Sequence, residues 1–528
     1  MNLYYRTENL RALGERNWVP LRPLTVLVGR NGAGKSTFLR SFPLLKQSIE
    51  TKGSAPVLWW GDYVDFGNYK SAVKNRDLER DISFEFRLED LHFQSFTDGR
   101  RRFISRANVK DVHVSAANLK VVLRSDKGRT SYREISLSLD DSDIQLRIEF
   151  PKKRDGLARI LINEVDFSDL CPNVEVSLPL VGVFEDPLFT RIVTRDGRKY
   201  HILTPFQVEI RRRFSAILAG VASKRLNLET VIQSAGRLLG KSVSTNTKFC
   251  DISTSNQLMS IKRVYEKIDN GELPDTRRNL TLLLGAHHLL EVLHEMSGHL
   301  SDYFLGMNYI GPARVRSERF YRQQELQVSS IAADGHNLPN FLASLTKGEL
   351  GKFSDWVRSG FEYGISIEQT EAHISIILDR EGRSANVIDS GYGVSQILPV
   401  LAQVWWMKSN GFGSRLRRGP SPETQTLAIE QPELHLHPAH QARLADVFAS
   451  AISGGDDGVK ISLLVETHSE SLLQRLGELI ENKRIAHDDI AILVFEDIDG
   501  EATIRQSKFD EFGILTNWPY GFFGYNMK

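Results

Sequence analysis

An α/β fold with a strand-rich lobe and an inserted helical domain is predicted by three features of this 528-residue sequence. First, an apolar strand at residues 24–28 runs into a glycine-rich turn and a helix. Second, short alternating segments broken by turns dominate residues 81–205, and helical spacing follows at 206–305. Third, helices and apolar strands alternate up to about residue 515, which is typical of a parallel sheet covered by helices.

These changes of pattern predict four segments. Residues 1–80 and 306–528 form the two parts of an α/β domain, 81–205 form the strand-rich lobe, and 206–305 form the helical insertion. A chain of this length is too long for one compact core, so a main domain with insertions is expected.

Composition excludes several classes of protein. Hydrophobic residues make up 41% and charged residues 25%, which is ordinary for a globular protein. No apolar run approaches the roughly 18 residues of a membrane span, and the N-terminus lacks a signal segment, so a cytoplasmic location is expected. Cys171 and Cys250 are far apart, which predicts two buried thiols and no disulfide framework.

The net charge of +1 gives no argument for nucleic-acid binding. Basic clusters do occur at residues 100–102, 211–213 and 415–418. Because long basic side chains are easily left in water, we expect these clusters to be solvated surface.

A phosphate-binding loop follows the first apolar strand and matches the pattern GxxxxGKS/T. Its backbone N–H groups are expected to surround phosphates at the N-terminus of a helix, with Lys35 on the β- and γ-phosphates and Ser36 on Mg²⁺. The motif consists of Gly29, Arg30, Asn31, Gly32, Ala33, Gly34, Lys35, Ser36 and Thr37.

A second motif is an apolar strand, residues 426–429, that ends in Glu430, Gln431, Pro432 and Glu433. A carboxylate at the tip of such a strand can hold the magnesium ion and its water shell beside the phosphate loop, so Glu430 is the Walker-B candidate. A further apolar strand at residues 461–465 ends before His468. Ligands of open α/β sheets lie at this edge, so His468 is expected to contact the γ-phosphate.

A third motif is the polar, glycine-rich turn at residues 389–396, which is followed by a helix expected at 397–406. Serine hydroxyls and free N–H groups at a helix N-terminus can bind an anion. The residues concerned are Ser390, Gly391, Gly393 and Ser395. Taken alone, the turn is equally compatible with an ordinary helix cap.

In this order, the three motifs resemble those of ABC-type ATPases of the SMC, RecF and OLD kind. The resemblance implies a two-lobed ABC-type ATPase head, a P-loop NTPase that binds ATP and Mg²⁺. It also implies that the turn with Ser390 and Gly391 is a signature motif that contacts the ATP of a second head, so that heads pair as a homo-oligomer around nucleotide.

Three further segments, residues 430–438, 309–314 and 517–523, resemble a bacterial anti-phage branch that includes Septu-type, PtuA-like ATPases. Some members are encoded with retrons beside an HNH nuclease and a reverse transcriptase. The resemblance implies regulation of a partner nuclease, possible contact with nucleic acid, including the RNA/DNA product of the reverse transcriptase, and no membrane.

One position departs from the ABC pattern. Gln431 stands where a glutamate commonly orients the attacking water, and an amide cannot act as a general base. Slow hydrolysis is therefore expected. Glu433, two residues further on, is the alternative base.

Some assignments stay open in the sequence. Gln47 is the nearest candidate for a Q-loop glutamine, and no residue can be assigned to the adenine. His435 and His437 could share a face, but turn packing explains them better than a metal, since no third ligand is in register.

Two other functions compete with the switch. An OLD-type nuclease would need a further domain after His468, and the acidic run at 496–499 is better explained as a hairpin. A repair clamp of the RecF or Rad50 kind would need a long heptad repeat, which residues 206–305 lack.

Overall fold

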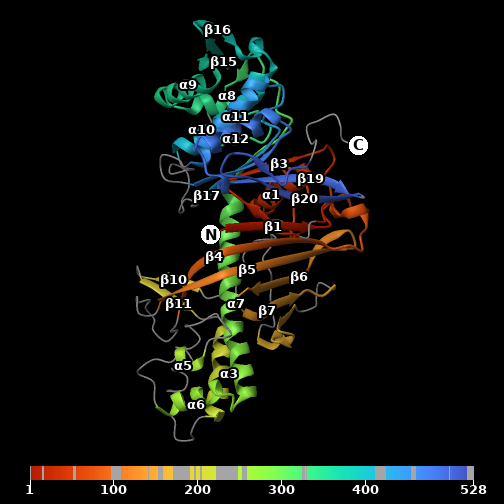
Figure 1. Cartoon of the computed structure of the whole chain (residues 1–528), viewed down its shortest axis with the longest axis vertical. Helices are drawn as coiled ribbons and strands as arrows, with labels where there is room; N and C mark the ends of the chain where they lie inside the picture. Colours follow the sequence, from red (N-terminus) through yellow and green to blue (C-terminus); the bar gives the residue numbers. More distant parts are fainter. Residues whose placement is uncertain are drawn as a thin grey trace. The chain divides into compact units, whose positions relative to one another are not determined.

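The chain forms two compact units in this computed structural model (Figure 1). Unit 1 comprises residues 1–8, 52–57 and 77–301, and unit 2 comprises 9–51, 58–76 and 302–528. The structure describes residues 2–14, 17–51, 55–96, 109–140, 142–152, 158–170, 191–195, 198–202, 205–221, 248–252, 259–323, 328, 330–410, 424–453, 460–498 and 500–519.

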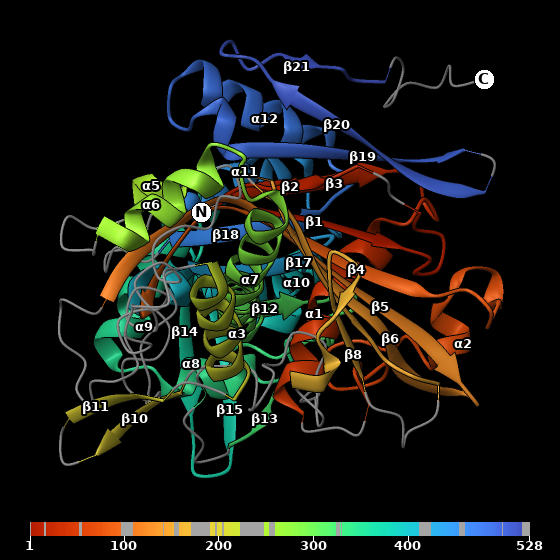
Figure 2. The ribbon, with the colours of Figure 1, turned by 90° about the horizontal axis from the view of Figure 1, so that it is seen from below.

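Unit 1 contains an antiparallel sheet in the order β1-β4-β5-β6-β7-β8-β9. Apolar side chains alternate along β4 at Ile82, Phe84, Phe86 and Leu88, and all four are buried, so one face of the sheet forms a core. Figure 2 shows β4, β5 and β6 side by side. The strands are β1 (Asn2–Glu8), β4 (Ile82–Phe96), β5 (Val109–Asp126), β6 (Arg129–Leu139), β7 (Ser142–Glu149), β8 (Arg159–Ile162), β9 (Val165–Asp166) and the separate pair β10 (Arg191–Arg195) and β11 (Arg198–Ile202).

The helices of unit 1 belong with this sheet, whereas the sequence analysis placed them in a segment of their own. Gly285 of α7 packs directly on the side chain of Ile144 in β7, with no room for a Cβ at that position. Arg213 of α3 pairs with Asp169 beyond β9. The helices are α3 (Pro205–Val221), α5 (Phe249–Ile252), α6 (Met259–Asp269) and α7 (Pro274–Leu305), whose residues 302–305 belong to unit 2.

Unit 2 is built on a seven-stranded sheet in the order β12-β17-β18-β3-β19-β20-β21. The strands from β12 to β19 run parallel, and β20 and β21 are antiparallel. Helix α1 lies on one face and α11 and α12 on the other (Figure 1), so every residue of β3 is buried. The elements are β3 (Leu24–Gly29), α1 (Lys35–Glu50), β12 (Met307–Ile310), β17 (Thr424–Glu430), α11 (Pro438–Ile452), β18 (Lys460–Glu466), α12 (Glu470–Glu481), β19 (Ile490–Ile498), β20 (Glu501–Phe509) and β21 (Leu515–Thr516).

A smaller antiparallel sheet in unit 2 joins β13, β15, β14 and β16. Phe353 of α9 and Trp405 of α10 pack together beside it, at 5.2 Å between ring centroids. This part carries the predicted signature turn. Its elements are β13 (Tyr321–Arg322), α8 (Leu338–Ser344), α9 (Lys347–Phe361), β14 (Gly364–Gln369), β15 (His373–Arg380), β16 (Arg383–Asn386) and α10 (Tyr392–Asn410). Unit 2 also contains the short strand β2 (Val19–Leu21), the short helix α2 (Tyr69–Ala72) and the 3-10 turns Lys74–Arg76 and His487–Asp489.

The predicted alternation of helices and apolar strands up to about residue 515 is confirmed, but α10 begins earlier than expected. It starts at Tyr392 and not at residue 397, because Gly391, with φ of 92°, alone breaks the chain between the short 3-10 turn Val387–Ser390 and the helix. Gly393 and Ser395 therefore lie inside the first turns of α10.

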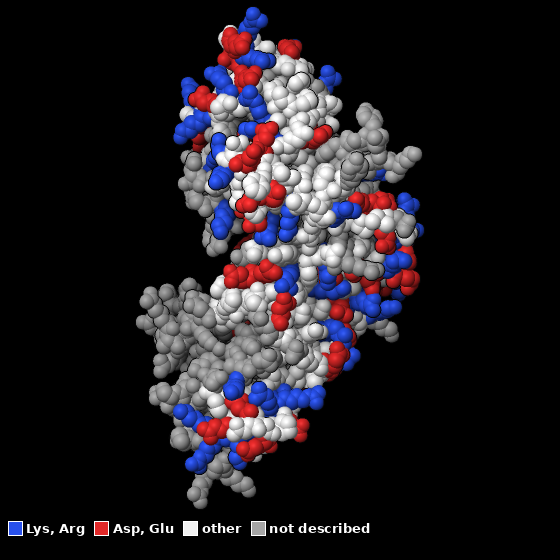
Figure 3. Space-filling model, viewed as in Figure 1, with Lys and Arg blue, Asp and Glu red and all other residues white. Residues whose placement is uncertain are grey.

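Positive and negative side chains are interspersed over the face drawn in Figure 3. Of the three basic clusters, 100–102 and 415–418 lie outside the described residues. In the third cluster, Arg212 and Arg213 pair with Glu209, and Arg212 is exposed as expected. Arg211 departs from the expectation, because two nitrogens of its guanidinium group are buried. Cys250 is a half-buried thiol outside any disulfide, not a fully buried one as predicted, and Cys171 lies outside the described residues. Within the described part of the chain, no helix has the length and apolarity to cross a membrane.

Candidate functional site

The phosphate loop of unit 2 connects β3 to α1, as the sequence predicted. Its backbone needs glycine at two points: Gly29 has φ of 149° and a Cβ there would lie 2.4 Å from the carbonyl oxygen of Phe495. Gly34 has φ of 99° at the N-cap of α1. Arg30, Asn31 and Gly32 are exposed at the tip of the turn, Ala33 is buried, and Thr37 lies in the first turn of α1.

Lys35 folds back over this loop. Its Nζ donates to the carbonyl oxygens of Gly29 at 2.9 Å and Arg30 at 2.8 Å, and its side chain is buried. Burial lowers the pKa of Lys35, while the charges of Glu466 and Glu433 oppose that effect. The ammonium group is thus held inside the loop that would surround a polyphosphate.

Two carboxylates lie side by side at the carboxyl edge of the parallel sheet. Strand β18 lies between β17 and β3. In the pairing of β17 with β18, Glu430 lies opposite Glu466. Both side chains are almost fully buried, at 1% and 2% exposure. The edge predicted for ligand binding therefore holds both acids next to the phosphate loop.

Glu466 is a site residue that the sequence analysis missed. Ser36 Oγ donates to Glu466 Oε1 at 2.9 Å, so the serine expected on Mg²⁺ is tied to this carboxylate. Burial, and then the charge of Glu430, raise the pKa of Glu466 to about 7. Its position as the last residue of an apolar strand, two before His468, was a signal for the assignment.

We expect Glu466→Gln to stabilise the nucleotide-free protein, and more so at high pH. Because the folded protein binds the Glu466 proton more tightly than the unfolded chain, this contribution to the free energy of unfolding is complete below the ordinary pKa of 4.5 and is lost as the pH rises through about 7. The amide has no such loss, so the variant should gain about 1–3 kcal/mol on the parent between these limits.

Urea unfolding at a series of pH values measures this difference. Glu481→Gln, at the exposed end of α12, is the matched control and should show little pH-dependent gain. A difference between Glu466→Gln and the parent that stays constant with pH would contradict the prediction.

Glu430 is clamped by residues from two other elements. Arg40 of α1 donates to both carboxylate oxygens at 2.8 Å, and Tyr309 of β12 donates to Oε1 at 2.6 Å. Arg314 donates to the backbone oxygen of Glu430 at 2.7 Å. The hydrogen bond with Glu430 raises the pKa of Arg40, and burial lowers the pKa of Arg314 to about 10.

Arg40 was not recognised in the sequence. It lies five residues after Lys35 on the helix that the phosphate loop opens, so helical spacing alone could not show that it reaches β17. Tyr309 and Arg314 were noted only as part of a family resemblance. Their contacts give those positions a physical role around Glu430.

Gln431, Glu433 and His468 meet beyond the strand tips. Gln431 has φ of 45°, a left-handed backbone uncommon for a residue other than glycine, and its N–H donates to the Glu466 carbonyl at 2.8 Å. The backbone N–H of His468 donates to Glu433 Oε1 at 2.6 Å. Burial raises the pKa of Glu433. The pKa of His468 is lowered, mainly by partial burial and to a smaller extent by the positive charge of Lys35.

The residues present fit a bound Mg²⁺. Among the described side chains, Glu433 Oε2 and Glu466 Oε2 are buried oxygens without a hydrogen-bond partner. Carboxylate and hydroxyl oxygens are the ligands that Mg²⁺ prefers, and Ser36 lies against Glu466. Mg²⁺ bound with ATP would supply positive charge to the β- and γ-phosphates. Ser36 with Glu466 would hold it, and Glu430 would do so once released from Arg40.

The predicted signature turn is partly exposed, and side-chain hydrogen bonds hold its first residues. Arg319 pairs with Asp389 through two hydrogen bonds of 3.0 and 2.7 Å, and Ser390 Oγ donates to the Asn386 carbonyl at 3.3 Å. Gly391 is exposed, and Gly393 packs so closely that a Cβ would lie 2.4 Å from the His435 carbonyl oxygen. Ser395 is buried within α10, so it is less accessible to a ligand than Ser390.

Other candidates take structural roles. The Gln47 amide donates to Leu58 and Val64 carbonyls and accepts two backbone N–H groups, so it fastens the 58–64 loop and is not placed as a Q-loop glutamine. His437 caps α11 through its Nδ1. Of the acidic run at 496–499, Glu496 and Asp497 lie at the end of β19, where Asp497 accepts from the Gly500 N–H and Glu496 pairs with Arg505, and Asp499 lies outside the described residues.

Comparison with protein families agrees with this geometry. Residues 320–473, which contain the signature turn, the Walker-B strand and His468, match the AAA ATPase domain family. This match supports the ATPase activity that the motifs predict. The fold of the chain is the ABC-type α/β fold predicted from the motifs. Residues 485–528 match a second family, described as a protein of unknown function (DUF3696).

Solved structures similar to this ATPase include SMC head domains. A crystal structure of the SmcHead bound to the C-winged helix domain of ScpA is 11% identical, with 97% of this chain and 98% of that chain covered, at a TM-score of 0.32. An SMC head domain from Thermotoga maritima is 8% identical, with 96% and 97% covered, also at 0.32. Likenesses of this size do not by themselves establish a shared function. No curated protein sequence matches the chain.

Proposed function

We propose that this ATPase is a slow switch in which two ATP-bound heads pair, each signature turn facing the nucleotide of the other head. The observation that carries the proposal is the turn in unit 2, the unit of the phosphate loop, at which Ser390 is partly exposed and hydrogen-bonded to Asn386 and Gly391 is exposed. Helix N–H groups with small neighbouring side chains suit a phosphate that approaches from outside. The pairing itself rests on the resemblance to ABC-type heads.

Chemically, the site supplies three functions. Backbone N–H groups and Lys35 hold the phosphates, and Ser36 with the carboxylates holds the metal. The His468 side chain, at the end of β18, is available for a hydrogen bond to the γ-phosphate. Gln431 can orient water through its amide but cannot take its proton, which supports slow turnover.

The proposal also includes a biological role in anti-phage defence. The resemblance to Septu-type, retron-associated ATPases supports control of a partner HNH nuclease in anti-phage defence, with nucleic acid or a reverse-transcriptase product as the trigger. An ATP-bound pair that persists is suited to restraining a toxic effector. Pull-down of the chain with the products of adjacent genes, with and without ATP, tests the partner.

Head pairing gives a separate prediction. Ser390→Arg should leave ATP binding within one head intact but abolish ATP-dependent pairing, because the large cation fills the surface that must approach a second nucleotide. Light scattering of the parent and the variant, with and without ATP, measures the mass. Ser384→Arg, on exposed β16, is the matched control and should pair as the parent does. Equal masses for Ser390→Arg and the parent with ATP would refute a signature that acts in trans.

A further inference from the structure

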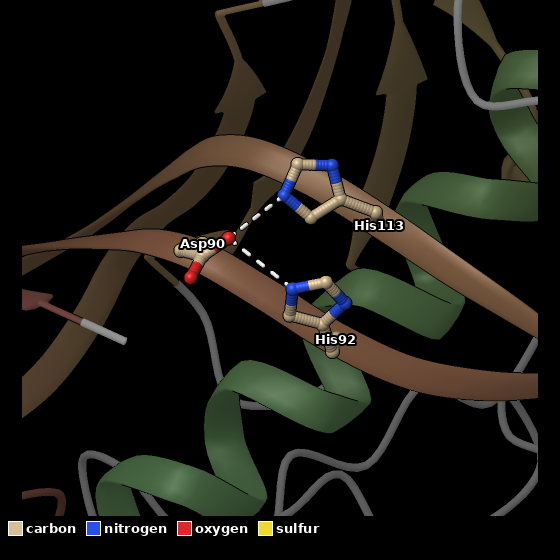
Figure 4. Close-up of side chains that lie close together, drawn as sticks. All are labelled: Asp90, His92 and His113. Carbon is tan, nitrogen blue, oxygen red and sulfur yellow. Dashed lines mark hydrogen bonds and ion pairs between the residues drawn. The ribbon is translucent and has the colours of Figure 1, made fainter.

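Three exposed side chains of the kinds that ligate metal ions meet on the sheet of unit 1. Asp90 and His92 lie on β4, and His113 lies on β5 (Figure 4). His92 and His113 are direct cross-strand partners, and Asp90 precedes His92 by two residues. The Asp90 carboxylate lies against both imidazole rings.

Their ligand atoms converge. Asp90 Oδ1 lies 2.9 Å from His113 Nε2 and 3.2 Å from His92 Nε2, and the two rings are 4.5 Å apart between centroids. One ligand atom from each residue lies within 4.8 Å of the others. In a tetrahedral zinc site with bonds of about 2.0–2.1 Å, ligand atoms are about 3.3 Å apart, so small side-chain movements would complete the set.

The backbone at Asp90 is unusual for a strand. Its φ is 60°, although the pairs Glu89–Ala116 and Leu91–Val114 keep one register on either side. A non-glycine residue in this region costs about 1–3 kcal/mol of strain and is often found where a side chain has a functional task. An ion pair among these residues would contribute little stability to offset this strain, because the side chains of Asp90, His92 and His113 are 61%, 64% and 53% exposed.

We propose that Asp90, His92 and His113 form a binding site for a divalent transition metal of the Zn²⁺ class. Two imidazole nitrogens and one carboxylate oxygen are typical of such ions and unlike the all-oxygen sets that Mg²⁺ and Ca²⁺ prefer. Three protein ligands leave one coordination position for water or another ligand. The metal would cross-link β4 and β5 at a paired position of their ladder.

The test is a calorimetric titration of the chelator-treated, nucleotide-free full chain with Zn²⁺ at neutral pH. The parent is expected to bind one Zn²⁺ at this site. His92→Ala, His113→Ala and Asp90→Asn should each weaken that binding by roughly 100-fold or more, since each removes a ligand. Because these side chains are exposed, the variants should keep the parent's circular dichroism and melting temperature without metal.

His336→Ala is the matched control. His336 Nδ1 lies 2.6 Å from Asp334 Oδ1 in an equally exposed pair without a second histidine, so this variant should bind Zn²⁺ as the parent does. Co²⁺ titration provides a second measurement, since tetrahedral nitrogen and oxygen ligation gives a strong visible absorption that the ligand variants should lose. Zn²⁺ binding that is unchanged in all three ligand variants, or absent from the parent, would overturn the site and leave an ordinary Asp–His ion pair.

Discussion

Mg²⁺-dependent ATP binding is expected to be lost in Lys35→Ala. The Lys35 ammonium is buried and held by the carbonyl oxygens of Gly29 and Arg30, inside the turn that surrounds the phosphates. Alanine removes the positive charge opposite the β- and γ-phosphates while the acids Glu433 and Glu466 remain. We expect a loss of at least about 100-fold in affinity, or roughly 2.7 kcal/mol.

Titration with a fluorescent ATP analogue measures this loss. Lys352→Ala, on the exposed face of α9, is the matched control and should bind as the parent does. Circular dichroism checks that the Lys35 variant is folded. Equal affinity of folded Lys35→Ala and the parent would mean that nucleotide is held elsewhere, and the site would have to be reassigned.

Gln431→Glu is expected to raise the rate of ATP hydrolysis by roughly ten- to a hundred-fold, equivalent to about 1.4–2.7 kcal/mol of barrier. The reason is chemical: the side chain at the tip of β17 changes from an amide that can only orient water to a carboxylate that can accept its proton. The left-handed backbone at Gln431 and its hydrogen bond to Glu466 do not depend on the side chain, so they are kept. ATP-bound pairs should then dissociate sooner.

Glu433→Gln is the informative comparison for this prediction. Glu433 has a raised pKa and a buried oxygen without a partner, which are properties of a general base as well as of a metal ligand. Steady-state phosphate release from the parent and both variants separates the roles. If Gln431→Glu changes nothing while Glu433→Gln stops hydrolysis, the base is Glu433. Fast hydrolysis in the parent that neither change alters would remove the basis for a slow switch.

The hydrogen bonds of Arg40 and Tyr309 to Glu430 bear on how Mg²⁺ and ATP can enter the site. Arg40 and Tyr309 occupy the carboxylate that the Walker-B assignment places on the metal, while Ser36 is bonded to Glu466. Binding of Mg²⁺ and ATP would need Glu430 to exchange Arg40 for the metal or its water shell. Nucleotide binding is therefore expected to rearrange side chains of α1, Arg40 first among them.

Local patterns in the sequence determined the phosphate loop, the Walker-B strand, the strand that leads to His468 and the alternation of helices and strands up to about residue 515. Each depends on residues close together in the chain. A glycine-rich turn with Lys35 and Ser36 after an apolar strand specifies its own backbone, and alternating apolar strands and helices specify a parallel sheet. The strands of residues 81–205 could also be predicted, because apolar and polar residues alternate there with a period of two.

Tertiary structure alone decided which distant residues meet. The contact of Ser36 with Glu466 spans 430 positions, and that of Arg40 with Glu430 spans 390. Whether Gln47 lines the nucleotide site or holds a loop depends on whether residues 58–64 pack against α1 at Gln47. The meeting of Asp90, His92 and His113 depends on the register between β4 and β5. A strand's period shows which side chains share a face, but a shift of the partner strand by one residue would move His113 to the other face, and that register is set by packing across the whole sheet.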